Sequence, residues 1–218
     1  MSWNKDESES RIKEILIDPI AVLEDNNCKG KRKLNYNEAN YHSTVAIFVD
    51  IRNSSEMLMN GDKKVTARII RAFTSETIGI LRDCQLQNKE IGVRGDCVYY
   101  ILRSYSKGLE DSLLDCALNI IEMVKILNKQ IKTKDYNNIN EIKVGIGISK
   151  ADTLSFKAGS KIFQNKSLVW VGESVTKASN LSNMANKGNK AILVNKEFHN
   201  SLSPESKKKK DSEYSVKD

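Results

Sequence analysis

The segment Thr44–Val49 constrains the fold of this chain more than any other part of its sequence. Its six residues, Thr-Val-Ala-Ile-Phe-Val, are apolar or β-branched without interruption, which is typical of a central strand covered on both faces. An acidic residue, Asp50, follows the run directly. The pattern therefore predicts a buried strand with a charged side chain at its mouth.

The other hydrophobic patterns predict helices and strands that alternate within one domain of ordinary size. Gly95-Asp96 lies between two strand-like runs and predicts a tight hairpin, because glycine supplies the positive φ that the turn needs. We expect further elements as helices at 53–84, 110–132, 172–186 and 196–202, and as strands at 141–149, 168–171 and 191–194. This order predicts an α+β fold with a ferredoxin-like βαββαβ core, in which helices pack on one face of a mostly antiparallel sheet.

Three regions follow from composition along the 218 residues. Residues 1–42 form an N-terminal extension, with a helix-like apolar run that Pro19 interrupts and a polar, loop-like stretch at 25–40. Residues 43–203 form the core domain, and Pro204 is expected to stop its last helix. Residues 204–218 are a polar, lysine-rich tail that we expect to be flexible.

Bulk properties exclude several classes of protein. The chain has no run of roughly 18 apolar residues that would predict a membrane span, and it has no secretory signal. Its four cysteines are scattered without a CxxC pair, which favours reduced thiols in the cytoplasm over zinc or a disulfide framework. The net charge is +7, and Lys29–Lys33 is its densest basic cluster. Binding of nucleic acid through this cluster is the least favoured function, because no aromatic-rich basic face accompanies it and such runs are more often solvated loops.

Asp50 and Asp96 form the candidate chemical centre. If their strands are neighbours, both carboxylates meet at one edge of the sheet. Two carboxylates without a nearby His or Cys suit Mg²⁺ or Mn²⁺, and Mg²⁺ commonly takes one or two protein carboxylates together with phosphate oxygens and water. Taken alone, each residue has a simpler reading: Asp50 caps the helix that follows, and Asp96 is a turn residue.

Four segments in order match a known pattern, and together they favour the metal site. The first two are Phe48-Val-Asp-Ile-Arg-Asn-Ser-Ser55 and Gly95-Asp-Cys-Val-Tyr-Tyr100. The others are Lys143-Val-Gly-Ile-Gly-Ile148 and Trp170-Val-Gly-Glu-Ser-Val-Thr-Lys-Ala-Ser-Asn-Leu181. The set resembles the class III adenylyl and guanylyl cyclases over roughly residues 43–195, so residues 43–203 are expected to be a nucleotidyl cyclase catalytic domain.

The resemblance implies a site with two metal ions at the interface of a head-to-tail homodimer, which has two such sites. Asp50, Asp96 and the backbone carbonyl of Ile51 would hold the two Mg²⁺ or Mn²⁺ ions beside a nucleoside triphosphate. The amides from Ile51 through Arg52 and Asn53 to Ser54 would cradle its phosphates. The region from Val169 to Asn180, including Trp170, would come from the other subunit.

Departures from the family pattern fall on that second half of the site. Thr176 and Asn180 stand where the family has an asparagine and an arginine that act in catalysis, and Asn180 lacks the positive charge. The implied replacements for that charge are Lys177, Arg52 and Arg94. The two base-reading positions of the family fall near Gly92 and Val169, which carry no group that would recognise a purine.

Two interpretations of these departures remain open. The pocket reads a different base, or the domain is a degenerate module that senses a nucleotide or a partner without turnover. The presence of both carboxylates favours the first. The chain resembles the pyrimidine cyclases of bacterial Pycsar antiphage defence, which make cyclic UMP or cyclic CMP for a separate effector. We therefore predict a uridylate or cytidylate cyclase, with a conventional adenylate or guanylate cyclase as the alternative.

Overall fold

The computed structural model describes residues 3–24, 34–83, 89–104, 108–134, 136, 139–160, 165–188 and 190–217. It divides into two compact units. The first consists of Met1–His42 and Leu154–Val171, and the second of Ser43–Thr153 and Gly172–Asp218. The basic cluster Lys29–Lys33 lies outside the described residues.

The first unit contains an N-terminal helix and two pairs of strands. Helix α1 (Lys5–Ile17) is capped by the Asn4 side chain and ends before Pro19. Strand β1 (Ala21–Glu24) pairs in parallel with the start of β2 (Glu38–Ile51), which therefore begins within the stretch expected to be a loop. The far end of β5 (Val144–Ser160) pairs with β6 (Asn165–Gly172). His42 is buried, and its ring meets that of Trp170 edge-on, with centroids 5.8 Å apart.

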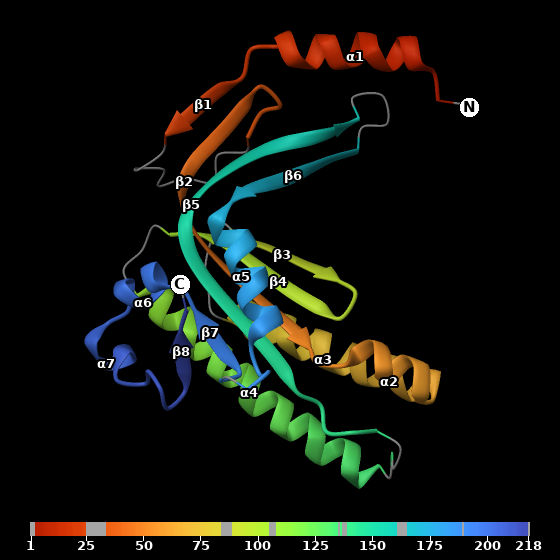
Figure 1. The fold of residues 1–218 in the computed structure, drawn as a ribbon, viewed down its shortest axis with the longest axis vertical. Helices are drawn as coiled ribbons and strands as arrows, with labels where there is room; N and C mark the ends of the chain where they lie inside the picture. Colours follow the sequence, from red (N-terminus) through yellow and green to blue (C-terminus); the bar gives the residue numbers. More distant parts are fainter. Residues whose placement is uncertain are drawn as a thin grey trace. The chain divides into compact units, whose positions relative to one another are not determined.

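The second unit contains the main sheet, whose described strands run in the order β3-β4-β2-β5-β7-β8. Strand β4 (Cys97–Arg103) pairs antiparallel with both β3 (Lys89–Arg94) and β2. Strand β7 (Ile192–Val194) pairs in parallel with β5 and with β8 (Tyr214–Val216). The predicted central strand and the Gly95-Asp96 hairpin are both present (Figure 1).

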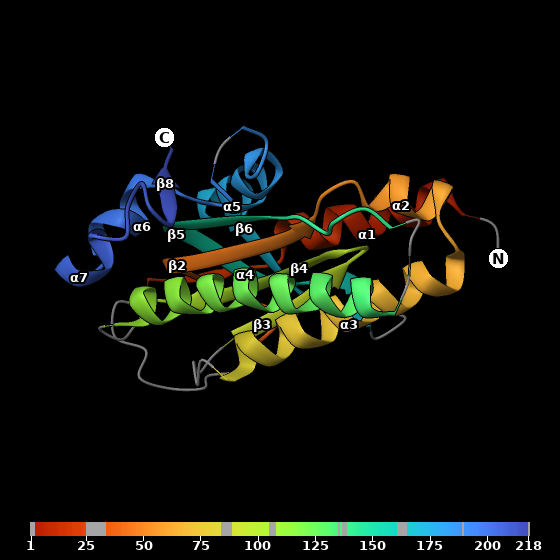
Figure 2. The same ribbon diagram turned by 90° about the horizontal axis from the view of Figure 1, so that it is seen from below.

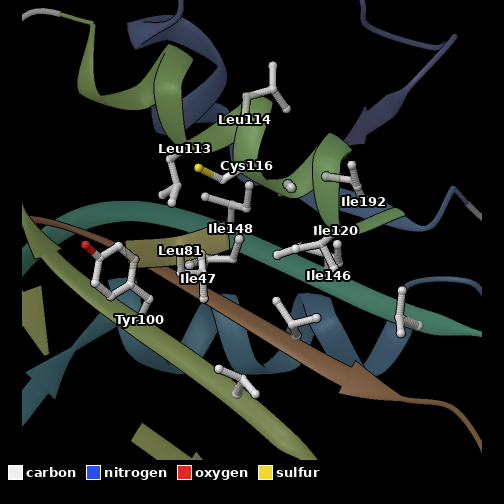
Figure 3. Close-up of a cluster of buried hydrophobic side chains, with 14 of the residues drawn as sticks. Ile47, Leu81, Tyr100, Leu113, Leu114, Cys116, Ile120, Ile146, Ile148 and Ile192 are labelled. Carbon is white, nitrogen blue, oxygen red and sulfur yellow. The ribbon is translucent and has the colours of Figure 1, made fainter. Parts of the chain in front are cut away.

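Helices α3 (Lys63–Asp83) and α4 (Leu109–Thr133) cover one face of this sheet. Their apolar stripes meet the inward side chains of the strands in one buried cluster, and Figure 3 shows part of it. Among its fully buried members are Ile47, Leu81, Tyr100, Leu113, Ile120, Ile146 and Ile148. Alternation along each strand therefore fixes which side chains turn toward the helices and which turn away.

Helix α5 (Glu173–Met184) packs on the opposite face, so the expectation that helices cover only one face is wrong in this respect (Figure 2). Gly147 explains the arrangement. A Cβ there would lie 2.1 Å from the Ala178 carbonyl oxygen and 2.2 Å from the Ser182 nitrogen, so α5 rests on the bare backbone of β5. Ile146 and Ile148 alternate with Gly147 and face the α3–α4 side.

Three further expectations differ from the structure. The helical region 53–84 is broken into α2 (Ser54–Asn60) and α3, and α2 ends at Gly61. Helix α6 (Lys196–Ser201) ends before Pro204 as expected, but a short helix that was not expected follows it: Pro204 opens α7 (Pro204–Lys207) at a position where its missing N–H costs nothing. The tail that we expected to be flexible contributes β8, and its Tyr214 is fully buried.

One of the two described cysteines differs from the expectation that the thiols are reduced. Cys97 is a free thiol. Cys116 is disulfide-bonded, which contradicts the expectation of reduced thiols at that residue. It lies on the buried side of α4, with its sulfur 3.8 Å from the Ile80 carbonyl oxygen of α3. None of the helices in the described ranges is long and apolar enough to cross a membrane.

Candidate active site

The carboxylates of Asp50 and Asp96 converge at one end of the β2–β4 pair. The register pairs Val49 with Val98, so Asp50 falls opposite Cys97, the residue after Asp96. Asp96 occupies the turn between β3 and β4, where Gly95 has a φ of +64°. The juxtaposition therefore follows from strand register and turn position, as the sequence predicted.

The electrostatics of Asp50 show that the two carboxylates influence each other. Burial raises the pKa of Asp50, the nearby charge of Asp96 raises it further, and Arg52 and Lys187 oppose both effects. Burial, together with the charges of Asp50 and Asp96, raises the pKa of Cys97 to about 12. The thiol beside the carboxylates is thus uncharged at neutral pH.

Arg52 is a cation that contacts this pair directly, through Asp50. Its guanidinium forms an ion pair with Asp50 Oδ2 and also donates to the Asn183 carbonyl oxygen, 3.0 Å away at the end of α5. Only 9% of its side chain is exposed. Gly145 provides the space, because a Cβ there would lie 2.9 Å from Arg52 Cζ. Arg52 partly offsets the negative charge of the site from within the same subunit.

The acidic pair fits a divalent metal ion in its donor chemistry. Asp96 Oδ2 is buried and has no hydrogen-bond partner among the described residues. A buried carboxylate oxygen that accepts no hydrogen bond, next to a second carboxylate, is a suitable ligand for a hard cation. No group of three or more His, Cys, Asp or Glu side chains that could hold a metal ion occurs in the described part of the chain. The pair alone is the sparse arrangement that suits an ion shared with phosphate oxygens.

The segment that we expect to cradle phosphates forms a turn between β2 and α2. Ile51 ends β2 with a buried side chain, and its neighbour Arg52 donates its backbone N–H to the Lys143 carbonyl oxygen at 2.8 Å. Asn53 adopts a left-handed conformation with a φ of 58°, and Ser54 begins α2. Whether these amides bind phosphate stays a prediction.

The residues predicted to act from α5 have partners of their own or line a hollow. Thr176 and Asn180 are exposed and separated by one helical turn, and the Thr176 hydroxyl donates to the Gly172 carbonyl oxygen at 3.3 Å. Lys177 forms an ion pair with Glu173 at 2.9 Å. A hollow of about 390 Å³ is lined by Lys177, Asn180, Leu181, Asn183, Met184, Asn195 and Lys217. Neither aspartate is among the described residues that line it.

The remaining predicted residues have separate positions. Arg94 is exposed at the end of β3, beside the turn that carries Asp96. Val169 and Trp170 belong to β6 in the first unit, and Trp170 makes the edge contact with His42 described above. The roles assigned to these three residues stay predictions.

Two lysines near these residues were not predicted from the sequence. Lys187 acts on Asp50 from the loop after α5, between residues with positive φ, Asn186 and Gly188. Lys217 lines the α5 hollow from the end of the chain, a segment that was expected to be a flexible tail. Neither has a sequence signal, because a lysine in a polar stretch looks the same whether or not the fold brings it to a site.

The fold and the acidic pair define a class of nucleotide enzyme, and comparison with known proteins identifies it. The model of the adenylate and guanylate cyclase catalytic domain matches residues 37–218, so the chain belongs to this family of nucleotidyl cyclases. The match begins one residue before β2 and extends over β8.

Individual relatives agree with this assignment. A protein named uridylate cyclase from Treponema porcinum is 39% identical over 95% of this chain and 71% of its own length. Another uridylate cyclase, from Gulbenkiania mobilis, is 32% identical over 91% of this chain and 79% of its own length. The crystal structure of a class III adenylyl cyclase-like ATP-binding protein from Pseudomonas aeruginosa superimposes with a TM-score of 0.70 at 17% identity, over 95% of this chain and 46% of that one. The class III cyclase fold predicted from the sequence is therefore confirmed.

Proposed function

We propose that this chain is a pyrimidine nucleotide cyclase, with UTP as the favoured substrate. The observation that carries the proposal is the convergence of Asp50 and Asp96, whose buried Oδ2 oxygen has no hydrogen-bond partner among the described residues. The choice of base is supported by two relatives named uridylate cyclase, which align over most of the chain. It is also supported by Gly92 and Val169, which offer no hydrogen-bonding side chain to a purine.

The reaction closes the triphosphate on its own ribose. The 3′-oxygen bonds to the α-phosphorus, the bond from that phosphorus to the bridging oxygen breaks, pyrophosphate leaves, and the hydroxyl proton is lost to solvent. Class III cyclase domains generally depend on divalent metals; two Mg²⁺ or Mn²⁺ ions, when bound, would acidify the hydroxyl and neutralise the phosphates. Asp50, Asp96 and the carbonyl of Ile51 are the proposed ligands, and Arg52 offsets part of the charge of Asp50.

A homodimer would complete the site. Class III cyclases generally dimerise, and the α5 hollow with Lys177, Asn180 and Lys217 offers polar and cationic groups at a place separate from the aspartates. In a head-to-tail dimer, the hollow of one subunit would face the carboxylates of the other. Thr176 and Asn180 would then contact the ribose and phosphates, and Lys177 would supply positive charge.

A cytoplasmic role in antiviral defence belongs to the same proposal. Its support is the resemblance to the Pycsar pyrimidine cyclases, whose cyclic nucleotide activates a separate effector. Cells that carry the gene are expected to accumulate cyclic UMP after phage infection. Unchanged levels, measured by mass spectrometry of cell extracts, would contradict this part of the proposal and leave the enzymatic part intact.

The enzymatic proposal is tested by product analysis. The purified chain is incubated with ATP, GTP, CTP and UTP in the presence of Mn²⁺, and the products are identified by mass spectrometry. Cyclic UMP is expected as the main product. A preference for CTP would keep the pyrimidine class and change the base, whereas a preference for ATP or GTP would defeat the pyrimidine proposal.

Aspartate variants test whether the carboxylates act in catalysis. Asp50→Ala and Asp96→Ala are each expected to lower kcat at least about 100-fold, because each removes a ligand of the catalytic ions. Asp83→Ala, at the exposed end of α3, is the matched control and should keep full activity. Nucleotide binding by the wild type without any cyclic product would instead identify a degenerate sensing module.

A further inference from the structure

A half-buried aromatic pair lies one row away from the carboxylates on the same strands. Phe48 precedes Asp50 by two residues in β2, and Tyr99 follows Cys97 by two residues in β4. Side chains two apart in a strand share a face. The intervening Ile47, Val49, Val98 and Tyr100 belong to the core under α3 and α4. Phe48 and Tyr99 therefore lie on the face that carries Asp50, away from these two helices.

Phe48, Tyr99 and Gly92 form one row across three strands. The register pairs Phe48 with Tyr99 and Tyr99 with Gly92. The rings of Phe48 and Tyr99 are stacked, with centroids 5.5 Å apart and an interplanar angle of 21°. A Cβ on Gly92 would lie 2.1 Å from both Cζ and Oη of Tyr99. The Tyr99 ring thus lies over the bare backbone of Gly92 and occupies the space into which a side chain at position 92 would project.

This row lies next to the carboxylates, on the face of the sheet where a nucleotide would be held. Two residues along a strand span about 7 Å, so the row lies about that far from Asp50 along the strands. Aromatic side chains beside such a position provide a surface on which a base stacks. The Tyr99 ring also reduces the space that would be left for a base, because the ring lies over Gly92.

We propose that Tyr99, held over Gly92 and against Phe48, is a specificity-determining residue that admits a one-ring base and excludes a two-ring base. The inference rests on the proposed pyrimidine cyclase function. It assigns the discrimination to the volume of the ring rather than to its hydroxyl group. Gly92 then acts as a positioning residue, because the Tyr99 ring can lie over the backbone at position 92 only when that position has no side chain.

The test compares kcat/KM for ATP and UTP in four single variants. Tyr99→Ala removes the ring, and the ratio of ATP to UTP turnover should rise about 10-fold or more as the pocket widens. Tyr99→Leu, which keeps an apolar side chain on the strand, should change the ratio in the same direction and serves if the alanine variant unfolds. Tyr99→Phe keeps the ring and should keep the ratio. Tyr100→Phe, in the core on the opposite face, is the control and should also keep it.

A double-variant cycle tests the role of Gly92. Gly92→Ala alone should lower kcat/KM for UTP, because the new methyl group displaces the Tyr99 ring. In the Tyr99→Ala background the same substitution has no ring to displace and should have little effect, so the two changes should not be additive. Additive effects would overturn the positioning role of Gly92.

The outcomes separate this inference from the proposed function. If the wild type forms cyclic UMP but Tyr99→Ala and Tyr99→Leu leave the ATP to UTP ratio within twofold, Tyr99 does not set specificity and only the inference fails. A shift in Tyr99→Phe as large as in Tyr99→Ala would assign selection to the hydroxyl group and overturn the steric proposal. If the wild type forms no cyclic pyrimidine nucleotide, the proposed function fails first.

Discussion

Gly145 and Gly147 determine how closely α5 approaches the sheet. A side chain on Gly147 would overlap the backbone of α5 at Ala178 and Ser182, and one on Gly145 would lie 2.4 Å from the Ser182 carbonyl oxygen. Gly145 also leaves room for the Arg52 guanidinium beside Asp50. Two residues without side chains therefore connect the packing of a helix to the electrostatics of the active site.

Gly147→Ala is expected to lower the free energy of unfolding by about 1–3 kcal/mol, because its methyl group meets backbone atoms that cannot rotate away. Chemical denaturation measures the change. Gly79→Ala is the matched control: a Cβ at Gly79, inside α3, would meet no atom within 4 Å, and alanine favours helices. This control should raise stability by up to about 1 kcal/mol. Equal stability of the two variants would contradict the packing argument.

Strand β8 was not predicted from the sequence, because its apolar pattern is too short to indicate a strand. It has three residues, follows a run of lysines, and pairs in parallel with β7 at the edge of the sheet. Its Tyr214 is fully buried, and the phenol oxygen lies 2.9 Å from His199 Nδ1 of α6. The segment is therefore part of the core, and it carries Lys217 to the α5 hollow.

Tyr214→Ala should cost about 3–5 kcal/mol of stability, as expected for removal of a large buried aromatic side chain. Thermal and chemical unfolding measure the loss. Lys208→Ala, which alters an exposed residue in the same segment, should change stability by less than about 0.5 kcal/mol. A tail without structural importance would instead give two variants that are as stable as the wild type.

Across the whole molecule, the predicted site residues fall into two groups. Asp50, Asp96 and Arg52 lie together, whereas Lys177 and Asn180 line a separate hollow with Lys217. If each group forms half of a site, a complete site requires two copies of the chain. We therefore expect two copies in head-to-tail contact to form two equivalent sites.

Mixing two inactive variants tests this arrangement. Asp50→Ala and the double variant Thr176→Ala/Asn180→Ala should each lose activity as homodimers. Co-expressed in equal amounts, they form heterodimers with one intact site, which should restore about a quarter of the wild-type activity. Light scattering measures the oligomeric state. A monomer with full activity, or a mixture no more active than its components, would show that one subunit holds the whole site.

The sequence by itself determined the central strand, the hairpin with Gly95-Asp96, the amphipathic helices α3, α4 and α5, and the convergence of the two aspartates. These features follow from local rules: apolar alternation selects strands and helices, glycine permits the turn, and neighbouring strands bring their ends together. Only the tertiary structure placed α5 on the second face, Arg52 on Asp50, Tyr99 over Gly92, and β8 in the sheet. Such contacts join residues far apart in the chain, and their energies depend on shape and burial that no local pattern encodes.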